Sequence, residues 1–172
     1  HLYAHDSSYL KRSLPHHHIY YNNHTNARAG TIIAIRKTYH NHYNISNTNI
    51  IAGRVQVVHL EPKLNSPLQL LPFQVINLYL STGTSDHLAR KRKELTSILS
   101  LPDDIHTFVA GDFNFVEDKD DASNFLPLDE ATEEVWARAK SHFGLREIHQ
   151  PSHTFFRVAR ENASRSASSR LD

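Results

Sequence analysis

The sequence predicts a mixed α/β protein built around a β-sheet. Short apolar runs rich in β-branched residues alternate along the chain with longer segments in which apolar residues recur at helical spacing. Some of the strand-like runs are joined by short polar connections and others by a helix, which is typical of a mixed sheet. With 172 residues, the chain is expected to form a single domain, residues 1–172, with a substantial core.

Four strands are expected in the first two thirds of the chain. They are predicted over residues 31–37, 53–60, 73–80 and 106–110. The second strand alternates in polarity and is expected to be half buried, whereas the nearly continuous apolar run of the third indicates a central strand. The segments around them are expected to be irregular: residues 1–29 mostly so, residues 41–49 as a polar connection, and residues 61–72, with three prolines, as a loop.

Two helices are predicted, over residues 84–102 and 129–144. The first opens on a hydroxyl residue that can cap it and an acid in its first turn, and a proline closes it. The second begins at Asp129 and ends near a glycine, with basic residues in its last turn. A short strand is expected at residues 154–156 and a Ser/Ala-rich loop at residues 162–169.

Composition excludes several classes of site. Cysteine is absent, so the chain has no disulfide, zinc-thiolate site or cysteine nucleophile, and an intracellular setting is allowed. No uncharged apolar run is long enough to span a membrane. The net charge of +1 is too small to indicate nucleic acid by itself. Because the chain begins with His, contains no Met and stops at Asp172 without a turn or helix stop, we expect a piece of a longer protein, truncated on both sides.

Residues 109–114, Val-Ala-Gly-Asp-Phe-Asn, are the most informative stretch. An apolar strand leads through a glycine to Asp112 and Asn114, and a two-residue spacing predicts that both side chains reach the same face of an open site. A carboxylate can bind a divalent cation or handle a proton, and an amide can donate to a phosphoryl oxygen. An ordinary strand followed by a turn uses the same residue types, so the motif alone leaves both interpretations open.

Other stretches accompany this motif in a fixed order along the chain: residues 30–37, an early strand with a basic end; 77–79, Asn-Leu-Tyr; 111–114, Gly-Asp-Phe-Asn; 152–156, Ser-His-Thr-Phe-Phe; and 169–172, Ser-Arg-Leu-Asp. With this ordered set, the chain resembles the endonuclease/exonuclease/phosphatase family, which has a deoxyribonuclease-I-like fold. It implies a four-layer α/β sandwich, in which two mixed sheets pack face to face with helices outside.

The resemblance also implies catalytic roles. Asp112 would position the attacking water and bind the metal ion, Mg²⁺ or Mn²⁺. Asn114 would donate a hydrogen bond to an oxygen of the scissile phosphate. Tyr79 would place its hydroxyl on the phosphate or on the leaving oxygen. Taken alone, a tyrosine such as Tyr79 is more often a core residue with a satisfied hydroxyl.

Three further residues have supporting roles by the same resemblance. Asn77 would support the site, Thr154 would contribute a phosphate or neighbouring contact, and Asp172 would orient a catalytic histidine. That histidine belongs to a Ser-Asp-His motif that the chain does not reach, and the family's early Asn and main metal-binding Glu are not found in a matching context. We therefore expect the isolated chain to be nearly inactive and marginally stable.

Within the family, the acidic continuation at residues 117–121 and the segment 145–148 look most like LINE-type retrotransposon endonucleases. This resemblance implies a DNA-nicking enzyme of a non-LTR retrotransposon, a monomer that binds the DNA phosphate backbone in the nucleus, with a reverse transcriptase in the same polyprotein. A phosphomonoesterase of inositol phosphates or nucleotides, and a non-catalytic remnant or binding module, stay open as alternatives.

Two charged or polar runs also have competing interpretations. The basic run at residues 90–93 lies on the first predicted helix, either as a DNA-phosphate contact or as its solvated face. The three histidines at residues 16–18 resemble a metal-binding tract or a tag remnant, but the polar sequence beside Pro15 favours a solvated loop.

Overall fold

The computed structural model describes residues 6–24, 30–66, 69–82, 85–117, 128–148, 155–157 and 167–169. The elements, in chain order, are α1 (Asp6–Ser13), β1 (His17–Asn23), β2 (Gly30–Arg36), the 3-10 helix η1 (Lys37–Asn41), β3 (Tyr43–Ile51), β4 (Val55–Pro62), β5 (Phe73–Tyr79), α2 (Ser85–Ile98), β6 (His106–Asp112), α3 (Glu130–Phe143), β7 (Phe155–Arg157) and β8 (Ala167–Ser169).

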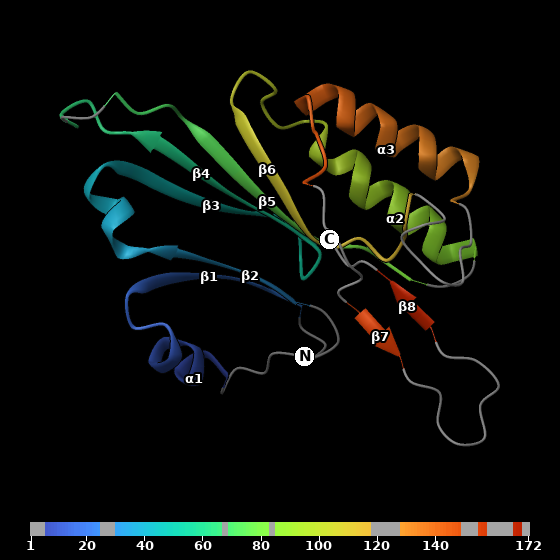
Figure 1. Ribbon diagram of the computed structural model, residues 1–172, viewed down its shortest axis with the longest axis horizontal. Helices are drawn as coiled ribbons and strands as arrows, with labels where there is room; N and C mark the ends of the chain where they lie inside the picture. Colours follow the sequence, from blue (N-terminus) through green and yellow to red (C-terminus); the bar gives the residue numbers. More distant parts are fainter. Residues whose placement is uncertain are drawn as a thin grey trace.

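The α/β class and the packing of two sheets with helices outside are confirmed (Figure 1). Strands β3, β4, β5 and β6 form a sheet in that order, antiparallel except for the parallel pair β5–β6, so this sheet is mixed. The antiparallel pair β1–β2 packs on one face of it, while α2 and α3 cover the other. The predicted central position of β5 is also confirmed, because it pairs on both sides.

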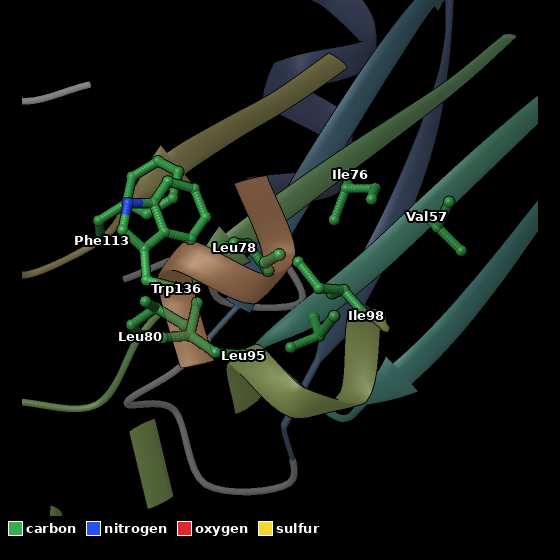
Figure 2. Packing of buried hydrophobic residues seen from close by; sticks show 10 residues of the cluster. Val57, Ile76, Leu78, Leu80, Leu95, Ile98, Phe113 and Trp136 are labelled. Carbon is green, nitrogen blue, oxygen red and sulfur yellow. The ribbon is translucent and has the colours of Figure 1, made fainter. Parts of the chain in front are cut away.

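Two apolar clusters hold these layers together. The larger lies between the four-stranded sheet and the helices, where the inward side chains of β4 and β5 meet Leu95, Ile98 and Trp136 (Figure 2). The smaller lies between the two sheets and includes Ile33 and Leu60. Since a β-strand points alternate side chains to opposite faces, β4 and β5 contribute to both clusters.

The expectation that residues 1–29 are mostly irregular was wrong. This segment contains α1 and β1, and β1 pairs with β2 from His17↔Arg36 to Asn23↔Gly30. Residues 17 and 18 therefore belong to a strand, so a solvated loop at the histidine run was also the wrong interpretation for them. Asn22 ties this pair to the larger sheet, because its fully buried amide donates to the Ile51 and Val55 carbonyl oxygens at 3.0 and 3.2 Å.

Four further expectations about strands and their ends were wrong. Residues 41–49 are largely strand β3, an edge strand that pairs along its length with β4. Its Asn47 accepts from Gln56 of β4 at 2.8 Å and its Asn49 donates to the Tyr21 carbonyl oxygen of β1 at 3.3 Å. Strand β4 is not half buried but buried on both faces over Val55–Val58, because it lies between the helices and the β1–β2 pair. Residues 167–169, expected in a loop, form β8. The loop predicted over residues 61–72 starts two residues later than expected, because β4 extends to Pro62.

The predicted helices are confirmed with small shifts at their ends. Helix α2 ends at Ile98, four residues before the predicted stop at Pro102, and Thr84 lies outside the described residues. Helix α3 has both of its predicted ends: Asp129 is the N-cap and Gly144 is a left-handed C-cap with φ 62°. The Asp129 carboxylate accepts from the Thr132 N–H at 3.2 Å and from the Arg92 guanidinium of α2 at 2.8 Å, so the same side chain also joins the two helices.

Replacing Asp129 by alanine is expected to cost about 1 kcal/mol of stability at pH 7, because the first turn of α3 loses its cap. Hydrogen bonding to Thr132, aided by Arg92, holds the pKa of Asp129 below its ordinary value of 3.8. A carboxylate with a lowered folded pKa stabilises the protein above its unfolded pKa, and this contribution is lost as pH falls through the folded pKa. The free energies of urea unfolding of the parent and Asp129→Ala should therefore differ at pH 7 and converge in acid. Glu134→Ala, on the exposed face of α3, is the control.

Candidate active site

The parallel pair β5–β6 brings two of the predicted site residues together. Tyr79 and Asp112 are register partners at the carboxyl ends of these strands, and the ladder continues where Leu80 N–H donates to the Asp112 carbonyl oxygen at 2.9 Å. Partners at the same level of neighbouring strands point to the same face of a sheet. The phenol of Tyr79 and the carboxylate of Asp112 therefore lie on one face, at one edge of the sheet.

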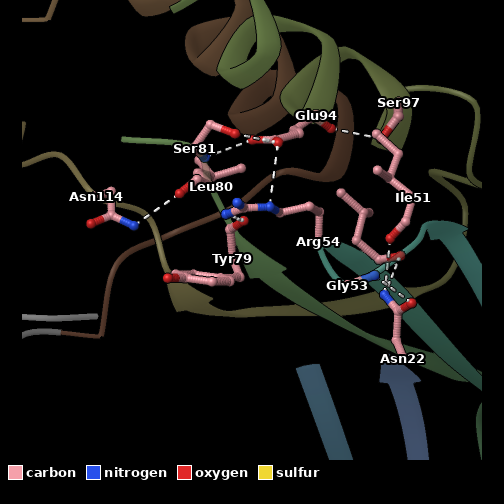
Figure 3. A network of polar contacts seen from close by, with 11 residues as sticks. Asn22, Ile51, Gly53, Arg54, Tyr79, Leu80, Ser81, Glu94, Ser97 and Asn114 are labelled. Carbon is pink, nitrogen blue, oxygen red and sulfur yellow. Dashed lines mark hydrogen bonds and ion pairs between the residues drawn. The ribbon is translucent and has the colours of Figure 1, made fainter. Parts of the chain in front are cut away.

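Beyond Asp112 the chain makes a turn rather than continuing as a strand. Asn114 has a left-handed backbone, φ 53°, and its N–H donates to Asp112 Oδ1 at 3.1 Å. Its side-chain amide donates to the Leu80 carbonyl oxygen at 2.9 Å (Figure 3). The two residues are thus adjacent as predicted, but through a hydrogen-bonded turn and not through strand alternation.

The turn is anchored on both sides. Gly111 adopts φ 138°, and a Cβ there would lie 1.9 Å from the Leu78 carbonyl oxygen, so only glycine fits. Phe113, between the two polar residues, is buried with its ring 5.2 Å from that of Trp136 on α3. The alternation of exposed and buried side chains in the motif therefore anchors the apolar residue and leaves Asp112 exposed.

Arg54 contacts Tyr79 directly and Glu94 supports it through Arg54 and Ser81, and neither residue was among the predicted site residues. The Arg54 guanidinium lies 4.5 Å above the centre of the Tyr79 ring and donates to the Tyr79 carbonyl oxygen at 3.1 Å (Figure 3). Its Nε lies 3.9 Å from the buried Glu94 carboxylate. Glu94 in turn accepts from both the N–H and the hydroxyl of Ser81 at 2.7 Å, so one buried carboxylate fixes the end of β5 and the cation beside Tyr79.

Asn77 joins the two sheets and does not reach the end of the strand. Its side-chain amide donates to the Ile32 carbonyl oxygen of β2 at 2.9 Å, two residues before Tyr79 on the same face of β5. The contact connects the sheets, and the supporting role of Asn77 in a site stays a prediction. Thr154 and Asp172 lie outside the described residues.

The basic run at residues 90–93 is not one solvated face. Lys91 is only 6% exposed, and its ammonium donates to the Asn114 carbonyl oxygen at 2.9 Å. Arg92 is paired with Asp129, while Arg90 and Lys93 are exposed. Helical periodicity carried the signal that was missed: Lys91 and Glu94 fall in the same stripe as Leu95 and Ile98, which is the buried face of α2.

Of the acidic run at residues 117–121, only Glu117 is described, and it forms an ion pair with Lys140 of α3. This pair is well exposed on both sides, as expected of a surface contact, and such pairs contribute little stability. The described part of the run therefore packs against α3 and adds no carboxylate to the site.

The described residues contain no group of three or more His, Asp or Glu side chains that could hold a metal ion. Asp112 is exposed at the carboxyl edge of the sheet, where its Oδ1 accepts from the Asn114 N–H and its Oδ2 has no hydrogen-bond partner among the residues that the structure describes. Mg²⁺ commonly binds through one or two carboxylates and keeps waters and substrate phosphate as its other ligands. Asp112 therefore fits one position in the coordination shell of such an ion.

Comparison with known proteins finds a likeness among solved structures. No family model matches the chain, and no curated protein matches it. Among solved structures, the chain is similar to the crystal structure of ANGEL2, a 2′,3′-cyclic phosphatase, in complex with adenosine-2′,3′-vanadate. The identity is 19% and the TM-score is 0.49, and the likeness covers 84% of this chain and 48% of that one, so the chain spans about half the length of its neighbour. Within the described residues, no helix is long and apolar enough to cross a membrane.

Proposed function

We propose that this chain carries part of the active site of a divalent-metal-dependent phosphoesterase of the endonuclease/exonuclease/phosphatase type. The observation that carries the proposal is the meeting of Tyr79, Asp112 and Asn114 at the carboxyl ends of two adjacent parallel strands. Ligands of α/β proteins bind at this edge of a sheet, where side chains from neighbouring strands converge.

Asn114, Asp112 and Tyr79 each have a polar group that is available for contact with a phosphate or with the attacking water. The amide nitrogen of Asn114 has two hydrogens, and since one is directed to Leu80 the other can donate to a non-bridging phosphoryl oxygen. Asp112 Oδ2 can accept a proton from the attacking water, and the Tyr79 hydroxyl can donate to the leaving oxygen. All three roles are compatible with the hydrogen bonds that hold Asn114 and the ends of β5 and β6 in the structure.

Mg²⁺ or Mn²⁺, when bound, would neutralise the charge that develops on the phosphate. Asp112 would contribute one carboxylate to it, and the main metal-binding Glu of the family has no counterpart in this chain. Arg54 stays on the Tyr79 ring and near Glu94, so it orients the phenol and adds positive charge close to the site.

As the substrate we propose DNA, nicked at its phosphate backbone by an endonuclease of a non-LTR retrotransposon. The sequence around residues 111–118 and 145–148 supports this choice. A nuclear location and a reverse transcriptase in the same polyprotein follow from it as further parts of the proposal. The alternative is a phosphomonoesterase of inositol phosphates or nucleotides, which would use the same three side chains.

The first test is binding of Mn²⁺, which broadens the NMR signals of nearby residues. We expect substoichiometric Mn²⁺ to broaden the amide signals of Tyr79, Asp112 and Asn114 first. In Asp112→Asn this selective broadening should disappear, because the amide is a poorer ligand for a hard cation. Glu61→Gln, an exposed carboxylate at the opposite end of β4, is the matched control and should leave the broadening intact.

Turnover then separates the substrate classes. Nicking of supercoiled plasmid in Mg²⁺, without release of phosphate from inositol phosphates or nucleotides, supports the endonuclease, and the reverse result supports the phosphomonoesterase. In either assay the chain is expected to turn over slowly, and Asp112→Asn should reduce that low rate to background, since acid–base catalysis contributes about 10²–10⁴-fold. No selective broadening by Mn²⁺ and no turnover would leave the non-catalytic module as the better description.

A further inference from the structure

Lys91 is a buried cation directed at the candidate site. It lies on α2 with 6% of its surface exposed, and its ammonium donates to the Asn114 carbonyl oxygen at 2.9 Å and lies 5.5 Å from the centre of the Phe115 ring. A lysine is almost never fully buried unless its charge is compensated. The buried ammonium therefore needs a hydrogen-bond partner, and its direct partner is the backbone carbonyl of Asn114.

The charged surroundings explain how the ammonium is tolerated there. None of the ion pairs between described residues includes Lys91. Asp129, Glu94 and Asp112 act on it through the electric field and favour its charged form, although burial outweighs them and lowers the pKa of Lys91 from its ordinary value. Three carboxylates from separate segments thus surround a cation whose direct hydrogen bond goes to Asn114.

The Asn114 carbonyl oxygen accepts its hydrogen bond from outside β5 and β6, whereas the other polar groups of Asn114 are held by residues of those strands or by the residue that follows β5. The N–H is held by Asp112 and the side chain by Leu80. A left-handed backbone at a non-glycine residue is uncommon and persists where the surroundings fix it. The hydrogen bond from Lys91 supplies the third contact, and it comes from a helix that packs behind the sheet.

We propose that Lys91 is a positioning residue, which fixes the Asp112–Asn114 turn by binding the Asn114 carbonyl oxygen and so sets the direction of the Asn114 amide toward a phosphate. This inference rests on the proposed function for its catalytic meaning. The positioning itself is a property of the folded chain and is measurable without turnover.

The test compares amide hydrogen exchange in the chain with that in Lys91→Met and Lys93→Met. Methionine keeps the length of the side chain and is well suited to a buried position, whereas Lys93 is exposed two residues further along the same helix. In Lys91→Met we expect exchange at Asn114 to rise by about tenfold or more, the effect of losing one charge-assisted hydrogen bond. Exchange at Thr132 in α3 should stay unchanged in both variants.

Two further readouts separate positioning from general stability. Lys91→Arg, which can donate to the same carbonyl oxygen, should restore part of the protection at Asn114. Selective Mn²⁺ broadening at Asp112 should weaken in Lys91→Met while the thermal midpoint stays close to that of the parent. If the parent shows no Mn²⁺ response but Asn114 loses protection in Lys91→Met, the proposed function fails and the positioning role stands.

Unchanged exchange at Asn114 in a folded Lys91→Met protein would overturn the inference. Should that variant not fold, the ammonium of Lys91 can be observed directly in the ¹⁵N,¹³C-labelled parent. A slowly exchanging signal with a coupling across the hydrogen bond to the Asn114 carbonyl carbon is expected. An ammonium signal averaged like that of exposed lysines would equally overturn the inference.

Discussion

Replacing Gly111 by alanine is expected to lower the free energy of unfolding by about 3 kcal/mol or more, from the sum of backbone strain and overpacking. A Cβ at this position would lie 1.9 Å from the Leu78 carbonyl oxygen and 2.8 Å from its carbonyl carbon. These atoms are backbone atoms of a central strand, so they cannot move without disturbing β5. A loss of this size is a large fraction of the stability of a typical domain.

Gly144→Ala is the matched control for this change. Gly144 also has a positive φ, 62°, but an added Cβ would meet nothing within 4 Å among the described residues. Its cost is therefore limited to the left-handed backbone, about 1–2 kcal/mol. Urea unfolding of the two variants beside the parent measures both values. Equal losses would show that the Leu78 backbone is no obstacle and that Gly111 is required for its φ alone.

Replacing Trp136 by alanine is the second change with a large expected effect, about 3–5 kcal/mol of stability. The indole packs against Phe113 at 5.2 Å and Phe115 at 5.9 Å between ring centres, and it belongs to the larger apolar cluster (Figure 2). Its removal leaves a cavity directly behind the Asp112–Asn114 turn. We therefore expect the amide signals of that turn to broaden in the folded fraction of the variant.

Trp136→Phe tests whether the loss comes from packing. The buried Nε1–H of Trp136 has no hydrogen-bond partner among the described residues, so replacing it with an apolar ring removes no hydrogen bond in this part of the structure. We expect a loss of roughly 1–2 kcal/mol, since most of the aromatic contact is retained. A phenylalanine variant as unstable as the alanine variant, in chemical unfolding at pH 7, would point instead to an essential indole N–H.

Sequence patterns predicted the interior of the fold better than its periphery. β5, β6 and α3 were recognised because continuous apolar runs and capping residues are local signals, and Asp129 and Gly144 serve as predicted. β3 and β1 were missed because asparagine, histidine and tyrosine dominate them. Their strand conformation is stabilised by pairing with β4 and β2, and this pairing is a tertiary effect that propensity does not contain.

The residues of the candidate site also fall into those that local sequence patterns indicated and those that only the folded structure reveals. A contiguous motif identified Asp112 and Asn114, and its order relative to residues 77–79 identified Tyr79. Arg54, Lys91 and Glu94 act through contacts with residues far away in the sequence, and none belongs to a recognisable motif. For the two residues on α2, helical periodicity could have indicated burial, but only the packed structure shows which strand end each of them contacts.

The parallel pairing of β5 and β6 has a consequence for the order of folding. The antiparallel strands β3, β4 and β5 are neighbours in sequence and can associate with little loss of chain entropy, whereas β6 joins only after the chain has passed through α2. Such a crossover closes a longer loop before its contacts are gained, so it is expected to form late. Tyr79 and Asp112 meet only at that step, and a partly folded chain that has completed its antiparallel strands still has no site.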